Sequence, residues 1–340
     1  VDAILDELRC VRERDDLSIE TVFVGGGTPT TLPDEPLRRL LVELRALICT
    51  DAYEFTVEAN PATIGPRTAR TLAECGVNRV SLGAQSFDVA ELRVLERIHD
   101  PAHIPQTLAR LRAVGIDNVN LDLIFAIPGQ TLAGWQTNLR QALELGVQHL
   151  SCYGLTYESG TPLHERLQRG NVRRCDESLE AEMYEATIDE LAAAGFEHYE
   201  ISNFARAGME CRHNLTYWQN LPYLGIGPAA AGYVNGCRYR NAPDLAAYVR
   251  HARDAWPPRS EVEHRDRAGE MRDTMMLGLR LIDGVEHAAF ERRFGTSLRT
   301  EYCEPLERHR QAGLLDDDDR GVRLTRRGLL LADTVIADFL

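Results

Sequence analysis

The sequence predicts an α/β protein built on a (βα) barrel, full or partial, with a small α-rich domain at the C-terminus. Up to about residue 195, short apolar segments alternate with segments of helical periodicity, and glycine-rich turns separate them. This alternation is typical of βαβ units with a mainly parallel sheet. Polar residues gather where the apolar segments end, and beyond residue 195 the alternation stops.

The expected elements follow one another regularly along the first part of the chain. The predicted strands are 20–24, 54–58, 79–84, 118–125 and 148–155. The predicted helices are 34–48, 66–75, 88–98, 103–115 and 131–146, and residues 1–8 are also typical of a helix. Right-handed crossovers leave two possible closures, an open doubly wound sheet or a barrel.

The polar strand ends favour the barrel. These residues are Glu58, Asn60, Ser81, Gln85, Asp122, Thr156 and Glu158. In a barrel the carboxyl ends of parallel strands converge on one mouth, so these side chains would line a single ligand site. Each of them taken alone is better explained as a cap or a turn residue, but five such strand ends in register favour a shared ligand pocket.

A glycine run ends the first predicted strand. Thr21–Val24 lead directly into Gly25, Gly26 and Gly27, and residues without a Cβ let a ligand approach the main chain. Thr28 or Thr30 is expected to cap the helix that begins near Pro33. The alternative is a sharp strand-to-helix turn that binds nothing.

The sequence divides into three expected parts. Residues 1–195 would form the barrel, 196–260 a connecting segment rich in Gly, Asn, Tyr and His, and 261–340 a helical domain with a short hairpin. Thr325 is expected to cap a final helix, which makes the last part similar to a winged helix. Such folds often bind DNA, but the acidic run Asp316–Asp319 in the expected wing favours a packing role.

Composition restricts the partners. The chain has 38 basic residues, all of them Arg, and 52 acidic residues, and its net charge of −14 argues against a nucleic-acid partner. The lack of Lys excludes a Schiff-base lysine. No apolar run is long enough to span a membrane. Eight scattered cysteines without a disulfide framework or a Cys-x-x-Cys pair indicate a reducing, cytoplasmic compartment.

Eight ordered motifs carry a resemblance to a known family. They are Gly25–Pro29, Glu58–Pro61, Ser81–Phe87, Arg97–His99, Asn120–Asp122, Pro128–Gln130, Glu200–Ala205, and Arg212–Asn214 with Tyr217 and Trp218. Together they resemble the radical S-adenosylmethionine (SAM) proteins related to oxygen-independent coproporphyrinogen III oxidase, and most closely the HemW-type haem chaperones. The resemblance covers essentially the whole chain and implies a partial, TIM-like barrel of the radical SAM type.

The resemblance assigns SAM binding to residues at the strand ends. They are Gly25, Gly26, Gly27, Thr28, Glu58, Gln85, Arg97 and Asp122. Carbonyl groups of the glycines would accept hydrogen bonds from the methionine ammonium of SAM. Glu58 would accept hydrogen bonds from both ribose hydroxyls, and the Gln85 amide would contact the ribose or the group next to it. Arg97 would pair with the methionine carboxylate as a two-pronged donor, and Asp122 would accept a further hydrogen bond.

The resemblance also implies a haem-binding pattern, His-Asn-x-x-Tyr-Trp, at His213, Asn214, Tyr217 and Trp218. The His213 imidazole would ligate the haem iron, and the two aromatic rings would flank the porphyrin. Relatives commonly have Gly and His where this chain has Ala229 and Ala231, which directs attention to His213. The alternative is a loop histidine hydrogen-bonded within its own domain.

One family feature is absent from these residues. Relatives bind a 4Fe-4S cluster through Cys-x3-Cys-x2-Cys, and the open iron of that cluster chelates SAM. None of the eight cysteines has this spacing. Either the sequence is truncated or the protein is a cluster-free relative, and the missing initiator Met favours truncation. As it stands, the chain is expected not to perform radical chemistry.

The expected function is haem binding and delivery to haem-accepting proteins. SAM would bind in the barrel, and the complete protein would add the cluster and require an electron donor for it. The first alternative is the oxidase, which decarboxylates the propionates of coproporphyrinogen III with a SAM-derived radical. The second is an unrelated barrel enzyme whose glycine turn binds phosphate.

Overall fold

The computed structural model describes residues 1–13, 17–97, 99–251 and 259–340. Ile98 of the Arg97–His99 motif and residues 252–258 of the expected connecting segment lie outside the described residues. The chain divides into two compact units. The sheet unit comprises Ile19–His198 and Ser202–Glu210, and the second unit comprises Val1–Ser18, Tyr199–Ile201 and Cys211–Leu340. The three-part division expected from the sequence stays a prediction.

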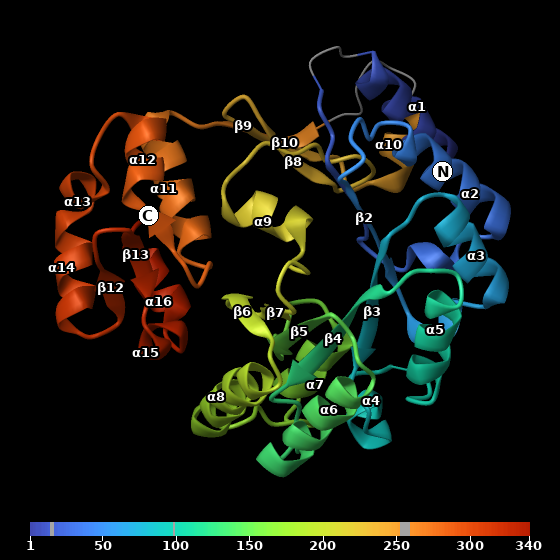
Figure 1. Cartoon of the computed structure of the whole chain (residues 1–340), viewed down its shortest axis with the longest axis horizontal. Coiled ribbons are helices and arrows are strands. Elements are labelled where there is room, and N and C mark those ends of the chain that lie inside the picture. The colour runs from blue at the N-terminus through green and yellow to red at the C-terminus, as the bar shows by residue number, and fades with distance from the viewer. Residues whose placement is uncertain (14–16, 98, 252–258) are drawn as a thin grey trace. The chain divides into compact units, whose positions relative to one another are not determined.

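The sheet unit contains the predicted alternation of strands and helices (Figure 1). Its elements are β1 (Thr21–Val24), α2 (Asp34–Arg45), β2 (Glu54–Ala59), α3 (Pro66–Glu74), β3 (Arg79–Gln85), α4 (Val89–Val94), α5 (His103–Arg112), β4 (Asn118–Phe125), α6 (Leu132–Glu144), β5 (His149–Gly154), α7 (Pro162–Gln168), α8 (Glu177–Ala193), β6 (Glu197–Glu200) and β7 (Asn203–Ala205). Every predicted strand and helix is confirmed, with shifts of a few residues at its ends.

In the described part of the chain, the main sheet has seven strands in the order β1-β2-β3-β4-β5-β7-β6. Strands β1 to β5 are parallel neighbours, as predicted. Strand β7 adds to β5 in the antiparallel direction, with His149 opposite Ala205. The sequence analysis did not predict this antiparallel addition. The structure is therefore a curled, partial barrel and not a closed one.

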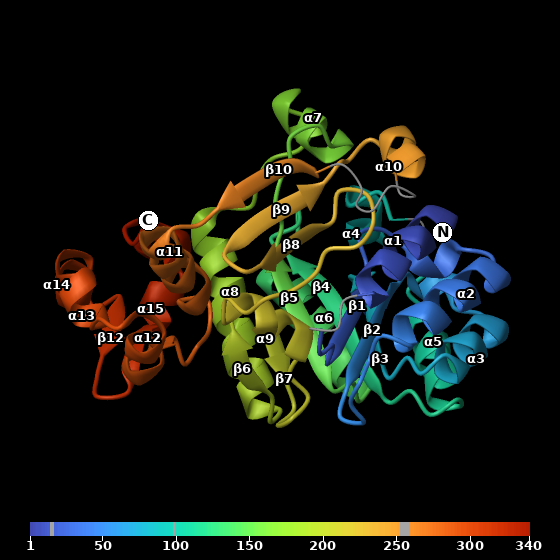
Figure 2. The ribbon, with the colours of Figure 1, turned by 90° about the horizontal axis from the view of Figure 1, so that it is seen from above.

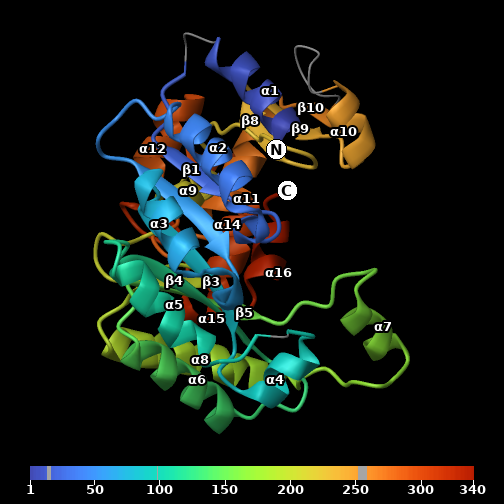
Figure 3. The same cartoon turned by 90° about the vertical axis from the view of Figure 1, so that its right-hand side faces the viewer.

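One face of the parallel strands is apolar and packs against helices. Leu82, Leu121 and Leu150 are in register on β3, β4 and β5 and are fully buried. Figure 3 looks onto α2, α3 and α5, which lie in front of the strands in that view. On α6, Trp135 is buried and donates its Nε1–H to the Thr187 hydroxyl of α8 at 2.8 Å. Burial of this face leaves the opposite face of the sheet for polar side chains.

Three local predictions were wrong. Helix α2 ends at Arg45, whereas residue 48 was expected. Helix α4 ends at Val94 and not at residue 98, and Glu96, with a φ of 57°, is no longer helical. Neither Thr28 nor Thr30 caps α2, because a 3-10 turn at Pro29–Thr31 intervenes and Pro33 occupies the N-cap. The Thr30 hydroxyl is hydrogen-bonded to the Thr63 hydroxyl instead.

The second unit combines the N-terminal helix with the C-terminal part of the chain. Its elements are α1 (Asp2–Arg12), α9 (Arg212–Trp218), β8 (Ala231–Val234), β9 (Cys237–Asn241), α10 (Leu245–His251), β10 (Arg259–His264), α11 (Arg267–Gly278), β11 (Val285–Glu286), α12 (His287–Phe294), α13 (Leu298–Glu301), α14 (Cys303–Gln311), β12 (Leu315–Asp317), β13 (Gly321–Leu324), α15 (Arg326–Leu329) and α16 (Ala332–Ala337). Strands β8, β9 and β10 form an antiparallel sheet that was not predicted (Figure 2).

The last 80 or so residues confirm the expected helices and hairpin. Thr325 accepts a hydrogen bond from the Gly328 N–H at 3.0 Å and so caps α15, as predicted. The acidic turn between β12 and β13 pairs with arginines: Asp317 binds Arg299, and Asp318 binds Arg323 at 2.8 Å. These pairs support a structural role for the turn. Among the described residues, no helix has the length and apolarity that a membrane span needs.

A buried glutamate ties α1 to the rest of the second unit. Glu7 is 1% exposed, and its carboxylate accepts from the Gly227 N–H at 2.8 Å, the Tyr248 hydroxyl at 2.6 Å and the Asn241 amide at 2.9 Å. Burial raises the pKa of Glu7, and the three hydrogen bonds only partly oppose that rise. The contact joins α1 to the loop before β8, to β9 and to α10.

Glu7→Ala is expected to destabilise the protein by about 3 kcal/mol, because three buried donors lose their acceptor. Glu7→Gln keeps the shape and is expected to cost about half as much. Urea denaturation followed by circular dichroism measures both losses.

The pH dependence provides the control. The pKa of Glu7 is higher in the folded protein than in the unfolded chain. Protonated Glu7 therefore adds to the free energy of unfolding at low pH, and this contribution is lost as pH rises through the folded-state pKa. The stability advantage of wild type over Glu7→Gln is therefore expected to shrink as pH rises above the ordinary glutamate range of about 4. An advantage that does not change with pH would contradict this account.

Candidate functional site

The inward face of the sheet carries a row of polar side chains. Glu58 of β2 pairs in register with Ser81 of β3, Ser81 with Asn120 of β4, and Asn120 with His149 of β5. Residues in register on neighbouring parallel strands point to the same face, so the four side chains lie side by side. Two residues further along, Asp122 belongs to the same face.

Asn120 organises this row. Its amide donates to Asp122 Oδ1 at 2.7 Å and to Ser81 Oγ at 2.8 Å. Its carbonyl oxygen accepts from His149 Nδ1 at 2.7 Å and from Ser151 Oγ at 3.2 Å. His149 is fully buried, and burial holds its pKa well below the usual range, so the ring is neutral. The hydrogen bond from Asn120 holds Asp122 in place.

Two carboxyl groups face this region. Burial raises the pKa of Glu58, and the nearby charge of Asp122 raises it further. Burial also raises the pKa of Asp122, although the hydrogen bond from Asn120 and the charge of Arg79 act in the opposite direction. Ionising both carboxyl groups at once is unfavourable, because they lie near each other and are partly desolvated. A cationic ligand would relieve that cost.

The glycine run lies against the first of these acids. The Gly26 N–H donates to Glu58 Oε2 at 3.2 Å, and Gly26 has a φ of 81°. A Cβ on Gly25 would lie 2.6 Å from the same oxygen, so a side chain there would displace the Glu58 carboxylate. Gly27 is exposed, with open space where a side chain would be. The run thus leaves its main chain accessible beside a carboxylate.

Gln85 ends β3 in a strained conformation. Its φ is 65°, in the left-handed region that non-glycine residues rarely adopt, and Ala126 after β4 has a φ of 60°. The Gln85 amide folds back over Gly83, where a Cβ would lie 2.8 Å from Nε2. Gly83 is in register with Asp122. Backbone strain at two adjacent strand ends is typical of ligand sites.

The structure therefore brings together five of the residues that were expected to bind SAM: Gly25, Gly26, Glu58, Gln85 and Asp122. It does not bring Arg97 or Thr28 into this group. Arg97 follows α4, is exposed, and within the described residues makes no side-chain hydrogen bond to the two acids or to Gln85. The Thr28 carbonyl accepts from the Thr31 N–H and hydroxyl in a local turn. Their roles in SAM binding remain predictions.

The expected haem-binding residues all lie on α9. His213 and Tyr217 are one turn apart, their rings are 4.9 Å apart, and His213 Nε2 is 2.8 Å from the Tyr217 hydroxyl. Tyr217 also packs edge-on against Tyr223 at 4.6 Å. His213 and Asn214 are half-buried. The helix thus presents an imidazole together with aromatic rings.

Trp218 completes this group. The Arg280 guanidinium lies 4.8 Å from the centre of the indole ring, within the range of a cation–π contact. The indole Nε1 is buried and has no hydrogen-bond partner in the described part of the chain. An unsatisfied buried donor is costly, and an anionic or polar group of a ligand would satisfy it.

The sequence analysis missed several of these residues. Asn120 was part of the Asn120–Asp122 motif but was given no role, and His149 was not singled out, because both join the site through the register between strands, which single-strand patterns do not give. Tyr223 and Arg280 join the α9 group through tertiary contacts that have no sequence signature. One available signal was overlooked: Asn235-Gly236, with φ values of 51° and 70°, is a typical hairpin turn and marks β8 and β9.

The cysteines do not form a cluster site. None of the eight is joined in a disulfide, and within the described residues no three His, Cys, Asp or Glu side chains are placed to hold a metal ion. The residues present thus do not fit a 4Fe-4S cluster.

Comparisons with known proteins place the chain in a family. Residues 1–142 match the Radical SAM superfamily and residues 266–331 match the HemN C-terminal domain. "Heme chaperone HemW" of Bacillus subtilis is 36% identical over 324 residues, which cover 95% of this chain and 86% of the relative. The protein of the same name from Lactococcus lactis is 36% identical over 344 residues, covering 100% of this chain and 90% of the relative.

A solved structure shows the same fold. The Escherichia coli coproporphyrinogen III oxidase HemN, described as a radical SAM enzyme, superimposes with a TM-score of 0.83 at 22% identity. The match covers 99% of this chain and 82% of HemN. The identity with the two relatives over nearly the whole chain shows that this protein belongs to the HemW family of the radical SAM superfamily.

Proposed function

We propose that this protein is a haem chaperone, which binds haem through α9 and delivers it to haem-requiring proteins. The observation that carries the proposal is the grouping of His213, Tyr217 and Trp218 on one short helix. Relatives that share 36% of its residues are named heme chaperones. Haem is the cargo in this proposal, and the acceptors are proteins that need it.

The chemistry of α9 suits haem. A neutral imidazole is a common axial ligand of haem iron, and flat aromatic rings pack well against a porphyrin. In this structure the Tyr217 hydroxyl contacts Nε2, the ring nitrogen farther from the main chain. Iron binding at that nitrogen would require this hydrogen bond to open. The hydrogen bond from Tyr217 would therefore control whether His213 can bind the haem iron.

The inward face of the sheet suits SAM. Membership in the radical SAM superfamily implies SAM and a 4Fe-4S cluster as cofactors. SAM carries a positive sulfonium and a positive ammonium, which match the two acids Glu58 and Asp122. The open main chain at Gly26 and Gly27 leaves room for the ligand beside Glu58. Because the cysteines do not fit a cluster, we derive no radical step for this chain.

Glu58→Gln is expected to weaken SAM binding about tenfold or more, because hydrogen bonds to a charged group contribute about 1.5–3 kcal/mol. Isothermal titration calorimetry with SAM and with S-adenosylhomocysteine, which lacks the sulfonium charge, measures the effect. We expect wild type to prefer SAM, and we expect Glu58→Gln and Asp122→Asn to reduce that preference. Glu35→Gln, on the exposed face of α2, is the control.

The pH dependence tests the same site. The raised pKa of Glu58 means that acidification protonates it earlier than an ordinary glutamate. SAM affinity is therefore expected to fall as pH is lowered toward about 5, before an exposed carboxylate titrates. An equal affinity for both ligands at every pH would count against SAM binding at this face.

His213→Ala is expected to lower haem affinity at least tenfold and to remove the imidazole-ligated haem spectrum, because the iron loses its protein ligand. Tyr217→Phe keeps the ring but releases Nε2, and it is expected to strengthen haem binding. Haem titration followed by absorption spectroscopy measures both variants. Unchanged haem binding and spectrum in His213→Ala would refute ligation by α9, and Tyr223→Phe is the matched control for the loss of a hydroxyl.

A further inference from the structure

A buried arginine lies on the inward face of the parallel sheet, in the layer of side chains next to the polar row of Glu58, Ser81, Asn120 and His149. Arg79 of β3 is 2% exposed. It precedes Ser81 by two residues on the same strand, so both side chains belong to the same face, about 7 Å apart along the strand. The sequence analysis did not single out Arg79, because its motif began at Ser81.

The register of the sheet gives Arg79 two polar neighbours. Arg79 is opposite Thr56 of β2 on one side and opposite Asn118 of β4 on the other. In the described part of the chain, three buried atoms of this layer have no hydrogen-bond partner, namely Arg79 Nε, the Thr56 hydroxyl and Asn118 Oδ1. A donor, an acceptor and a group that serves as either thus lie together in one layer without partners.

The charge of Arg79 has no anion in contact with it. Within residues 1–13, 17–97, 99–251 and 259–340, its guanidinium forms no hydrogen bond, ion pair or ring contact. Its positive charge opposes the rise in the pKa of Asp122 and helps to lower the pKa of His149, which indicates that it faces the interior of the sheet unit. A buried charge without a partner is strongly unfavourable, so an anion bound beside Arg79 would stabilise the fold.

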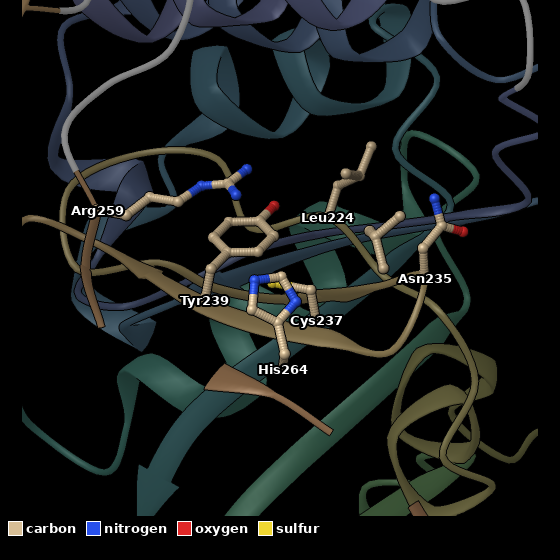
Figure 4. A pocket seen from close by; sticks show the side chains of 7 residues that line it. Leu224, Asn235, Cys237, Tyr239, Arg259 and His264 are labelled. Carbon is tan, nitrogen blue, oxygen red and sulfur yellow. The ribbon is translucent and has the colours of Figure 1, made fainter. Parts of the chain in front are cut away.

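Other arginines show how a guanidinium is satisfied in this protein. Arg238 of β9 donates from Nε to Asp273 at 2.9 Å. At the cavity on the three-stranded sheet, the Arg259 guanidinium lies over the ring of Tyr239, 3.8 Å from the ring centre (Figure 4). Among the described residues, Arg79 has neither kind of partner, although it is more buried than Arg238 and Arg259.

The chemistry of this layer suits a carboxylate. A planar guanidinium matches the two oxygens of a carboxylate through a pair of N–H donors. The Thr56 hydroxyl would donate to a carboxylate oxygen, and Asn118 Oδ1 would accept from an N–H or O–H group of the same ligand. A water molecule would satisfy the N–H groups, but it would leave the buried charge without a counter-charge.

We propose that Arg79, together with Thr56, binds a carboxylate group of a small ligand inside the sheet unit. The carboxylate is either that of the amino-acid part of SAM or that of a separate small acid, and the experiment distinguishes these two sources. The first source rests on the SAM site proposed above, and neither source depends on haem binding. Arg97, which the family resemblance assigns to the methionine carboxylate, is exposed and does not join Glu58 and Asp122 in this structure.

Thermal unfolding of the full chain in sodium formate tests the site, with sodium chloride at equal ionic strength as the reference. Formate is expected to raise the melting temperature of wild type by about 2–4 °C in a saturable manner, because it binds the folded state. Arg79→Met is expected to abolish this rise. Arg79→Lys keeps the charge without the two-pronged geometry and is expected to retain part of the rise.

Two controls accompany this measurement. Arg140→Met, which removes an exposed arginine of α6, is expected to respond to formate as wild type does. Without formate, Arg79→Met is expected to melt no lower than wild type, because an unpaired buried charge has been removed. This second control also shows that the variant folds.

Calorimetric titration with SAM and with decarboxylated SAM identifies the source of the carboxylate. If SAM supplies it, wild type is expected to bind SAM at least tenfold more tightly than decarboxylated SAM, and Arg79→Met is expected to bind both equally. If a separate acid supplies it, Arg79→Met keeps the SAM preference of wild type and loses only the formate response.

The proposal is overturned if Arg79→Met keeps every response to formate and to the SAM carboxylate that wild type shows, or if wild type shows neither response. A chain that binds no SAM would refute the SAM site, and the formate measurements would still decide whether Arg79 binds a carboxylate. Haem titration of Arg79→Met is expected to match wild type, so failure of this proposal leaves the haem-chaperone function standing.

Discussion

The strand register of the parallel sheet is the constraint on which the candidate SAM site depends. It places Glu58 and Asp122 on the same face, with Asn120, two residues before Asp122 on β4, as the donor that holds Asp122 in place. Two acids near each other in a partly desolvated region are unfavourable, and hydrogen bonds to both, together with the charge of Arg79 on Asp122, partly offset that cost. The glycines follow from this arrangement, because a side chain at position 25 would collide with the Glu58 carboxylate.

In the second unit, the buried carboxyl group of Glu7 organises the structure around it. Glu7 is satisfied by three donors from distant parts of the sequence, and two of them come from the loop before β8 and from β9. Because that loop also contains Gly225, whose N–H donates to the Tyr239 hydroxyl, the carboxylate of α1 helps to fix the position of β9 in the three-stranded sheet. The carboxyl group of Glu7 thus holds parts of the second unit together. In the sheet unit, by contrast, the proposed role of Glu58 and Asp122 is to bind a ligand.

The sequence predicted the parallel strands correctly because each is short, apolar and followed by an amphipathic helix. It did not predict β10, whose residues are exposed throughout and show no alternation, although the Asn235-Gly236 turn signalled the hairpin before it. The Glu58, Gln85 and Asp122 part of the site was predictable from strand ends and family resemblance. Asn120 and His149 were not assigned to the site, because their roles depend on pairing between strands. The Thr30 cap failed because a tertiary hydrogen bond to Thr63 outweighs the local capping preference.

The environment of each histidine decides which of them is suited to haem. His149 belongs to the polar row, but it is fully buried and its Nδ1 is bound to Asn120, so iron could reach it only by disrupting the sheet. His213 is half-buried and stands on a seven-residue helix, and its Nε2 is hydrogen-bonded to the Tyr217 hydroxyl, a contact that ligand binding can replace. The inward face of the sheet therefore retains hydrogen-bonding and charge chemistry suited to a cationic nucleoside. In the proposed function, iron ligation falls to His213 of the second unit, where the ring of Tyr217 can support a porphyrin.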